Sequence, residues 1–458
     1  MPLHLTDSLT EKSVSFPKTK KPVRLFVCGP TVYDHSHIGH ARTYIAFDAF
    51  ARFLRWEKQP VTYIQNITDV DDKIIARAAE LGAPYTAIAR RYERAYHAAE
   101  KKLNIASVDT YPRASAHLKE IIALIETLIA KGYAYQTDHG VYFEVKKFPR
   151  YGELSRQNLD AVRPGWRVEI DPQKKDPLDF ALWKKTKGEK PAWQSPWGAG
   201  RPGWHIEDTA ITQKLFGVQY DIHGGASELK FPHHESEIAQ QEAASGKHPM
   251  VKAWMHTGVL LINGQKMSKS LKNFVTIDEF LSAYSANALR YLVLSHHYRS
   301  PIDYSTETAR AAHDAMQAIE RFAAYSAFVA GAKKTGKRLA LAPFEKTFTA
   351  ALENDFNTPA ALAELFRVIS QINENAFLLH YADILTARAW ILHMLAVLGF
   401  APPKTQKIPA AICRWSKERE ICRGNKQFMQ ADSLRKKIQE VGYSVDDTPI
   451  GPFLYHQR

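Results

Sequence analysis

Cysteine and long apolar runs are both scarce in this sequence. Its 458 residues include three cysteines, too few for a disulfide framework, and this usage is typical of a reducing compartment. No stretch approaches the roughly 18 uncharged apolar residues of a membrane-spanning helix. The first 22 residues hold lysines but neither an apolar core nor a small-residue cleavage site, which excludes an ordinary secretory signal. We therefore expect a cytoplasmic protein with no membrane partner, while an organellar address stays open.

Negative charge is also in short supply. The chain has 61 lysines and arginines against 48 aspartates and glutamates, which gives a formal net charge of +13 and a pI near 9.3. This balance does not determine the fold, but it favours a polyanionic partner such as nucleic acid. The length is sufficient for about two to four domains, each with its own core.

The chain is organised around a junction between a strand and a helix near its beginning. The short apolar run 23–27 precedes Gly29-Pro30 and predicts a buried strand that ends in a turn. From Ala41 the apolar residues recur at intervals of three and four, which predicts a helix. In open α/β sheets such a junction binds nucleotides, because helix N-terminal amides and strand ends converge on the ligand.

Segments downstream repeat this alternation. Residues 61–67 predict a second strand, and Thr68-Asp69 predicts the cap of a helix through residues 72–76. Apolar spacing predicts another helix over 118–132, and residues 204–265 resume the alternation. Strands and helices at this spacing predict an α/β fold with a doubly wound parallel sheet.

Two short elements supply groups suited to ATP chemistry. His37 and His40 lie one helical turn apart with Gly39 between them, and the missing Cβ of glycine leaves room for a flat base. About 230 residues later, Lys266 and Lys269 lie in a loop of small residues, where flexible ammonium groups can follow phosphate charge as it develops. Each element alone is more often a helix cap or a solvated turn. Together, in this order, they resemble the signature pair of class I aminoacyl-tRNA synthetases.

The resemblance narrows to one family, the cysteinyl-tRNA synthetases. It covers residues from about 20 to 310 in the family's order and continues more weakly to the C-terminus. The matching blocks are Cys28–Asp34 leading into His37–His40, then Asn66–Asp69, Gly203–Glu207, Asp221–Gly225 and Phe231–Glu235. The resemblance implies ATP-dependent ligation of L-cysteine to tRNA(Cys) through a cysteinyl-adenylate, with Mg²⁺ accompanying ATP and the protein acting as a monomer.

The resemblance also implies the domain layout. A Rossmann-like catalytic domain is interrupted by a short connective insertion and is followed by an α-helical bundle and a small C-terminal anticodon-binding module. The expected boundaries are 1–132 and 204–303 for the two halves of the catalytic domain, 133–203 for the insertion, 304–401 for the bundle and 402–458 for the module. The insertion is too short for an editing domain, so the cysteine site must reject serine by sensing sulfur directly.

Residue roles follow from the matched motifs. The resemblance implies that His37 and His40 stabilise the transition state at the α-phosphate, and that two lysines close over the leaving pyrophosphate. It assigns four residues to catalysis, namely His37, His40, Lys266 and Lys269. It places ATP against Thr31, His37, Gly39, His40 and Lys269, and the cysteine substrate against Cys28, Thr68, Trp204 and His223.

One position departs from the family's metal site. The family holds zinc with two cysteines, a histidine and a glutamate, because a zinc-bound thiolate distinguishes cysteine from serine. Cys28, His233 and Glu237 match three of these ligands, and the last two lie four residues apart on one helix face. The remaining position holds Asp208. Aspartate is an accepted zinc ligand with the charge of a thiolate, so we expect zinc to be retained, held less tightly, with harder metals competing better.

The C-terminal segment is basic. Between Lys404 and Val441, ten lysines and arginines stand against four acidic residues, and alone such a run indicates a solvated helix face. With the resemblance in view, a basic module carrying Trp415 and Phe428 predicts an anticodon reader that stacks unpaired bases. The residues that match the family's tRNA contacts are Arg423, Phe428 and Asp447, with Phe428 where a larger tryptophan is often found.

Two other functions stay open on the sequence. One is a paralogue that activates cysteine and passes it to an amino sugar, which the long helical and basic tail disfavours. The other is a degraded synthetase that only binds RNA. Asp208 suggests it, whereas the intact elements at 37–40 and 266–270 disfavour it.

Overall fold

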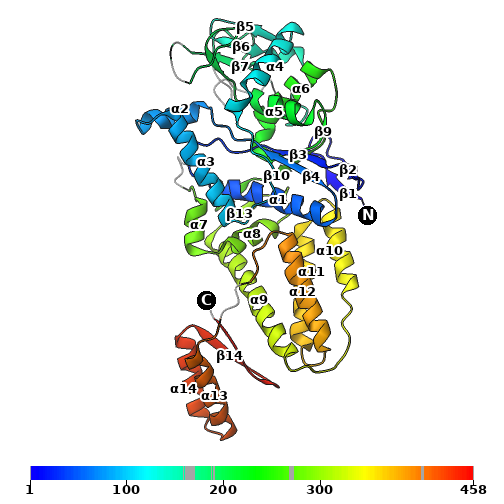
Figure 1. The fold of residues 1–458 in the computed structure, drawn as a ribbon, viewed down its shortest axis with the longest axis vertical. Helices are drawn as coiled ribbons and strands as arrows, with labels where there is room; N and C mark the ends of the chain where they lie inside the picture. The colour runs from blue at the N-terminus through cyan, green and yellow to red at the C-terminus, as the bar shows by residue number, and fades with distance from the viewer. Residues whose placement is uncertain are drawn as a thin grey trace. The chain divides into compact units, whose positions relative to one another are not determined.

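The computed structural model describes residues 2–157, 159, 171–186, 188, 191–267, 273–403 and 407–456. They form two compact units (Figure 1). The first unit comprises Met1–Ala286, His296–Ser305 and Leu352–Asn357. The second comprises Asn287–Ser295, Thr306–Ala351 and Thr358–Arg458.

A four-stranded parallel sheet lies at the centre of the first unit. Its strand order is β10-β9-β3-β4, with bounds β3 (Val23–Val27), β4 (Val61–Gln65), β9 (Tyr220–Ala226) and β10 (Val251–Thr257). Helix α1 (Ile38–Trp56) follows β3 and packs on β4, β9 and β10, where it buries Phe47 and Phe50. Because β3 is an inner strand, Leu25, Phe26 and Val27 are fully buried. The prediction of a parallel α/β sheet is confirmed.

The helices of this unit include α2 (Asp72–Glu80), α3 (Tyr85–Lys102), α4 (Leu118–Ala130), α5 (Ile206–Phe216) and α6 (Glu235–Ser245). The predicted cap of α2 is wrong. Asp71 caps this helix by accepting a hydrogen bond from the Lys73 amide at 2.8 Å, whereas Asp69 accepts from the Ser115 amide at 2.9 Å. Local sequence could not separate these aspartates, because the choice depends on a partner 46 residues away.

The segment between the two halves of the sheet carries an antiparallel sheet of its own, at the top of Figure 1. It consists of β5 (Ala134–Gln136), β6 (Gly140–Phe143), β7 (Phe180–Lys185) and β8 (Gly200–Pro202). Phe143 and Phe180 from this sheet share one hydrophobic cluster with Ile206 of α5 and Ile238 of α6. The insertion is therefore fixed against the catalytic fold, and β8 leads directly into α5.

Short strands complete the unit. A hairpin joins β1 (Leu3–Thr6) and β2 (Ser13–Phe16), and a second sheet has the order β12-β11-β13, with β11 (Leu260–Ile262), β12 (Gln265–Lys266) and β13 (Ile302–Tyr304). Helix α7 (Ile277–Ala283) begins at a capping box between Thr276 and Glu279. The β11-β12 hairpin thus ends at Lys266, where the predicted lysine loop begins.

The second unit is mainly helical, as predicted. Its helices are α8 (Ala286–Leu294), α9 (Thr306–Ala330), α10 (Ala342–Glu353), α11 (Thr358–Asn375) and α12 (Tyr381–Val397). The first residue of α8 and the last two residues of α10 belong to the first unit. The chain continues into α13 (Ala410–Gly424), α14 (Phe428–Glu440), β14 (Tyr443–Thr448) and β15 (Gly451–His456). Ile412, Ile438 and Val445 form the small core of this last part. Among the described residues, no helix combines the length and apolar composition that crossing a membrane requires.

Candidate active site

The N-terminus of α1 is hydrogen-bonded to the segment that follows the lysine loop. The Ile38 amide donates to the Val275 carbonyl, and the Ile277 amide donates to the Ser36 carbonyl, both at 3.1 Å. The ring of Phe274 meets that of His37 edge-on at 4.9 Å. The tertiary structure therefore joins two elements that are far apart in the sequence.

The two histidines of the first element cap their own helix. His37 Nδ1 accepts from the amides of Gly39 at 3.1 Å and His40 at 3.3 Å, and His40 Nδ1 accepts from the His37 amide at 3.3 Å. An imidazole whose Nδ1 accepts carries its proton on Nε2 when it is neutral. Burial and the neighbouring His37 hold the pKa of His40 well below its usual value. Both rings can therefore offer an Nε2–H donor at neutral pH.

Gly39 lies against the ring of His37, and the expected approach of a flat base to this glycine stays a prediction. A Cβ at this position would lie 2.8 Å from His37 Nδ1, so glycine is required for the cap itself. The same Cβ position lies 3.8 Å from the Met267 side chain, which brings the start of the lysine loop to α1. Lys266 forms an ion pair with Glu228, and Lys269 lies outside the described residues.

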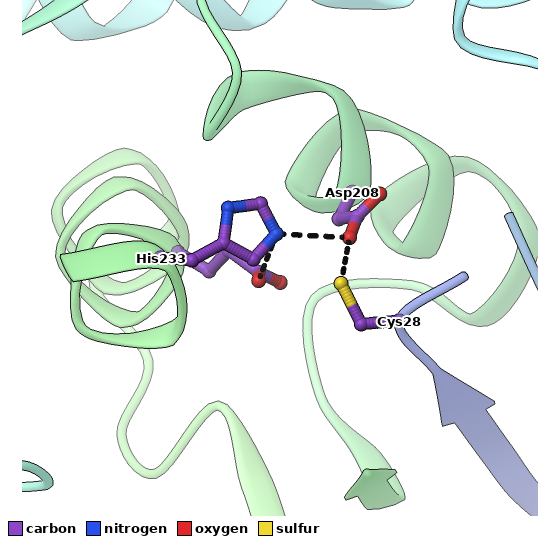
Figure 2. A group of neighbouring side chains, drawn as sticks. Cys28, Asp208 and His233 are labelled. Atoms are coloured by element: carbon purple, nitrogen blue, oxygen red, sulfur yellow. Dashed lines mark hydrogen bonds and ion pairs between the residues drawn. The ribbon is translucent and has the colours of Figure 1, made fainter. Parts of the chain in front are cut away.

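Four residues from separate elements meet in a buried group (Figure 2). Cys28 follows β3, Asp208 lies on α5, His233 lies in the π-helical turn Lys230–His234, and Glu237 lies on α6. One ligand atom of each lies within 4.8 Å of all the others. Asp208 Oδ2 is 3.0 Å from Cys28 Sγ and 3.2 Å from His233 Nε2, which lies 3.3 Å from Glu237 Oε1. This buried group contains the four residues that the sequence proposed as metal ligands.

The charges in this group fit a divalent cation. Asp208 Oδ1 and both carboxylate oxygens of Glu237 are buried without a hydrogen-bond partner among the described residues. Burial, with help from Asp208 and Glu207, raises the pKa of Glu237 well above its usual value. Burial and the adjacent carboxylates of Asp208 and Glu237 likewise raise the pKa of the Cys28 thiol. Bare carboxylate oxygens beside a thiol and an imidazole form a donor set that zinc accepts, and metal binding would release their protons.

The ring of His233 is held from its far side. Its Nδ1 lies 2.9 Å from His205 Nδ1, and the Gln240 side-chain amide donates to the His205 carbonyl at 3.1 Å. Trp204 stacks over the His233 ring with centroids 4.4 Å apart. A hydrogen bond at one imidazole nitrogen orients the other toward a metal, and this arrangement directs Nε2 at the buried group.

More buried histidines surround Glu237. His223 Nε2 lies 3.6 Å from Glu237 Oε2 while its Nδ1 lies 2.6 Å from the Tyr220 hydroxyl, and His234 Nδ1 lies 2.8 Å from His256 Nε2. Burial lowers the pKa of His223, His234 and His256 well below the usual value, so these rings are neutral at pH 7. Sequence reasoning gave a role to His223 alone. The adjacency of His233 and His234 in the matched block was the signal that the pocket holds more than one imidazole.

Thr68 lies against the turn after β3 and reaches a glutamate. Its amide donates to the Pro30 carbonyl at 3.2 Å, and its hydroxyl donates to Glu207 Oε1 at 2.6 Å. A Cβ at Gly29 would lie 1.7 Å from the Asn66 carbonyl oxygen, so this close approach requires glycine. Glu207 belongs to a matched block, yet sequence reasoning gave it no role.

The three predicted tRNA contacts lie near the C-terminus. Arg423 pairs with Asp447, which also binds Arg419 at 2.6 and 2.9 Å. Phe428 is 61% exposed and thus free to stack. Trp415 is half-buried, and the Lys437 ammonium lies 4.2 Å from its ring centroid. Lys437 thus lies over the Trp415 ring, and stacking of a base on Trp415 stays a prediction.

Comparison with known proteins connects this site to a family. The sequence model of the "tRNA synthetases class I (C) catalytic domain" matches residues 14–314. A cysteine–tRNA ligase of Alkalilimnicola ehrlichii is 43% identical over 98% of this chain and 98% of its own length. One of Pseudomonas fluorescens is 44% identical over 95% of both chains. The chain belongs to the cysteine–tRNA ligase family.

Two further comparisons concern the fold of this family member. One solved structure with a similar fold is that of Mycobacterium tuberculosis methionyl-tRNA synthetase in complex with methionyl-adenylate, with a TM-score of 0.60 and 18% sequence identity. The match covers 82% of this chain and 89% of the synthetase chain, which establishes the class I fold. The sequence model of the DALR domain matches residues 347–401. That match falls on α10 to α12 and ends before the small module at the C-terminus.

The raised pKa of Glu237 predicts a pH-dependent stability in metal-free protein. The native state binds the carboxyl proton of Glu237 more tightly than the unfolded state does, because the pKa of a glutamate in the unfolded chain is near 4.5. This stabilisation is present below that pH and is lost as pH rises through the native pKa. Glu237→Gln removes it, so the melting temperature of the wild type minus that of the variant should fall between about pH 5 and about pH 8.

Thermal unfolding in the presence of a chelator measures this difference. The buried histidines act in the opposite sense, because their lowered pKa makes stability rise with pH, but they are common to both proteins and cancel in the difference. Excess zinc should abolish the pH dependence of the difference. A difference that is constant with pH in chelated protein would show that Glu237 is ionised throughout.

Proposed function

We propose that this chain ligates L-cysteine to tRNA(Cys) in an ATP-dependent reaction, with the residues described above in the matched roles. Nearly the whole chain aligns with cysteine–tRNA ligases, and this coverage is the observation that carries the proposal. An amino-sugar acceptor is disfavoured because the likeness to tRNA ligases extends through the DALR segment. A protein that only binds RNA is disfavoured by the joined elements at His37 and residues 275–277.

The first step forms cysteinyl-adenylate. The cysteine carboxylate attacks the α-phosphate of ATP, and pyrophosphate leaves with Mg²⁺. His37 and His40 donate from Nε2 to phosphate oxygens, where negative charge grows in the transition state. Thr31 and Gly39 lie beside them, and Lys266 and Lys269 would hold the leaving pyrophosphate. Because the capping hydrogen bonds fix both rings beforehand, little reorganisation is needed at the moment of reaction.

In the second step a hydroxyl of the terminal ribose of the tRNA attacks the carbonyl carbon of cysteinyl-adenylate, the bond to the α-phosphate breaks, and AMP leaves. We propose that Cys28, Asp208, His233 and Glu237 hold one zinc ion, which when bound supplies a ligand site for the substrate sulfur. Thr68, Trp204 and His223 would complete the pocket around the substrate. A serine hydroxyl is a poorer zinc ligand than a thiol, which accounts for discrimination without an editing domain.

We further propose the domain roles. Residues 1–132 and 204–303 form the catalytic domain around the insertion 133–203, the bundle spans 304–401, and 402–458 reads the anticodon. We place the protein in the cytoplasm as a monomer with no membrane partner. The tRNA ligation named for the relatives supports a place where translation occurs.

The activity predicts pyrophosphate exchange that depends on cysteine and needs no tRNA. Lys269→Ala should lower the exchange rate by about 10²-fold or more, the scale for removing a contact with transition-state charge. Lys346→Ala, a lysine on α10 outside the site, serves as a control and should exchange at the wild-type rate. Wild-type protein that exchanges with no amino acid, or with serine as well as with cysteine, would contradict the proposed function.

The metal site predicts about one zinc per chain, measured by elemental analysis of purified protein. Asp208→Cys should tighten zinc by roughly 10–100-fold, the scale of changes in the ligand environment, and should raise the preference for zinc over cobalt because sulfur is the softer donor. Cys28→Ala and His233→Ala should lose both the metal and the discrimination against serine. Cys413→Ala, a cysteine outside the site, should retain both. Metal-free protein that still selects cysteine would refute the zinc assignment.

The exposed ring of Phe428 predicts a stacking contact with the anticodon. Phe428→Ala should lower kcat/KM for tRNA charging by about 10- to 100-fold, the scale of one lost base–aromatic stack, and should leave pyrophosphate exchange unchanged. Leu385→Ala removes an apolar side chain that is 42% exposed on α12 and should change neither rate. Equal charging by both variants and wild type would exclude Phe428 from the anticodon site.

A further inference from the structure

We propose that Glu207 binds the α-ammonium group of the substrate. The inference rests on the proposed function, since it takes cysteine as the ligand, and it adds a residue to which the matched motifs give no role. Glu207 lies in the first turn of α5, directly before Asp208, and is 2% exposed. It is hydrogen-bonded to Thr68, which pairs with the turn that follows Cys28, and Glu207 therefore borders the buried group that would receive the substrate sulfur.

The position of Glu207 is fixed from the other side of the pocket. Its Oε1 accepts the Thr68 hydroxyl at 2.6 Å. The Thr68 amide and carbonyl bind the Pro30 carbonyl and the Val32 amide, each at 3.2 Å, in the turn that follows Cys28. The carboxylate is thus oriented by one hydroxyl, and no described group donates a hydrogen bond to Oε2.

The nearest charged groups around Glu207 are acidic. Among the described residues, no lysine, arginine or histidine forms an ion pair with it, and the charged groups that influence it most are the carboxylates of Asp208, Asp71 and Asp69. A buried carboxylate without a cation or a full set of hydrogen bonds is costly, so such groups are usually paired or serve a ligand. The unpaired carboxylate therefore indicates a cationic ligand.

A metal ion at the neighbouring group would not neutralise Glu207. Cys28, Asp208 and Glu237 contribute three negative charges when deprotonated, and a divalent cation offsets two of them. The sulfur of a bound substrate adds a further negative charge. The positive group that the substrate itself brings is its α-ammonium, with three hydrogen-bond donors for carboxylate oxygens.

This contact would also orient the reaction. Once the sulfur and the ammonium nitrogen are both bound, the substrate carboxylate can project from Cα in only one direction. This fixes the direction from which the carboxylate approaches the α-phosphate. Since the ammonium keeps its charge throughout the step, Glu207 binds the ground state and the transition state alike. Its loss should appear in KM and leave kcat almost unchanged.

Three thiols separate ammonium recognition from sulfur recognition. Cysteamine keeps the thiol and the ammonium but lacks the carboxylate, whereas 3-mercaptopropionate keeps the thiol and the carboxylate but lacks the ammonium. We would measure the dissociation constants of both and of cysteine by calorimetry on zinc-loaded protein, in wild type and in Glu207→Gln, which preserves side-chain shape. Glu100→Gln is the matched control, a buried glutamate that accepts hydroxyls from Tyr96 and Tyr111.

In Glu207→Gln, cysteine and cysteamine should bind about 10²-fold more weakly, the scale of losing one partner of a buried charge pair, while 3-mercaptopropionate should bind as before. KM for cysteine in pyrophosphate exchange should rise in parallel, at similar kcat and unchanged zinc content. Glu100→Gln should bind all three thiols like the wild type.

Wild-type protein alone gives a second test that does not depend on the folding of a variant, since it should bind cysteamine more tightly than 3-mercaptopropionate. The proposal is overturned if the wild type prefers 3-mercaptopropionate. It is also overturned if Glu207→Gln weakens all three thiols equally, as a purely structural role would, or weakens none. Failure of the proposed function is distinct, because wild-type protein would then show no cysteine-dependent exchange.

Discussion

The catalytic fold depends on the enclosure of acidic groups at the carboxyl end of its parallel sheet. Asp208, Glu207 and Glu237 are all buried near the Cys28 thiol. One oxygen of Asp208 and both oxygens of Glu237 have no hydrogen-bond partner among the described residues, and Glu207 accepts one hydrogen bond, from Thr68. Such a cluster is unstable on its own, because burial opposes charge and the carboxylates repel one another. It is maintained by elements that arrive from four parts of the chain and by neutral histidines packed around it. Such a cluster favours ligands that bring positive charge, which supports the metal and ammonium sites proposed above.

Asp208 changes the chemistry of this cluster without changing its charge. A thiolate and a carboxylate each contribute one negative charge, so the group keeps the same electrostatic demand for a divalent cation. The softness differs, since the donor set has one sulfur, one nitrogen and two oxygens. The carboxylate also keeps a second oxygen that is buried without a partner, whereas a sulfur would leave none. The group thus offers a metal a single protein sulfur.

The start of α1, where we propose that phosphate binds, is built by a different principle. Its two histidines are held by backbone amides at a helix start, and the same helix start pairs with residues after the lysine loop. Helix capping and ligand binding are often treated as rival explanations for such histidines. Here one arrangement serves both, because a cap that occupies Nδ1 leaves Nε2–H available to an anion. The described residues that follow the lysine loop, Val275 and Ile277, are in turn hydrogen-bonded to the backbone at the start of α1.

Much of this protein could be predicted from the sequence alone. Apolar periodicity placed β3, β4, α1 and the helices of the second unit, because those patterns are local and strongly spaced. Family motifs selected Cys28, Asp208, His233 and Glu237, and the spacing of the last two already put them on one helix face.

Other features were decided only by the tertiary structure. The cap of α2 depends on which aspartate Ser115 engages, and the role of Gly39 depends on where the His37 ring lies. The role proposed for Glu207 depends on its hydrogen bond with Thr68 and on the absence of an ion pair with any described residue. In each case the deciding contact joins groups whose proximity and orientation cannot be read from the sequence. Local propensity and residue spacing also do not indicate which buried charge is left without a partner.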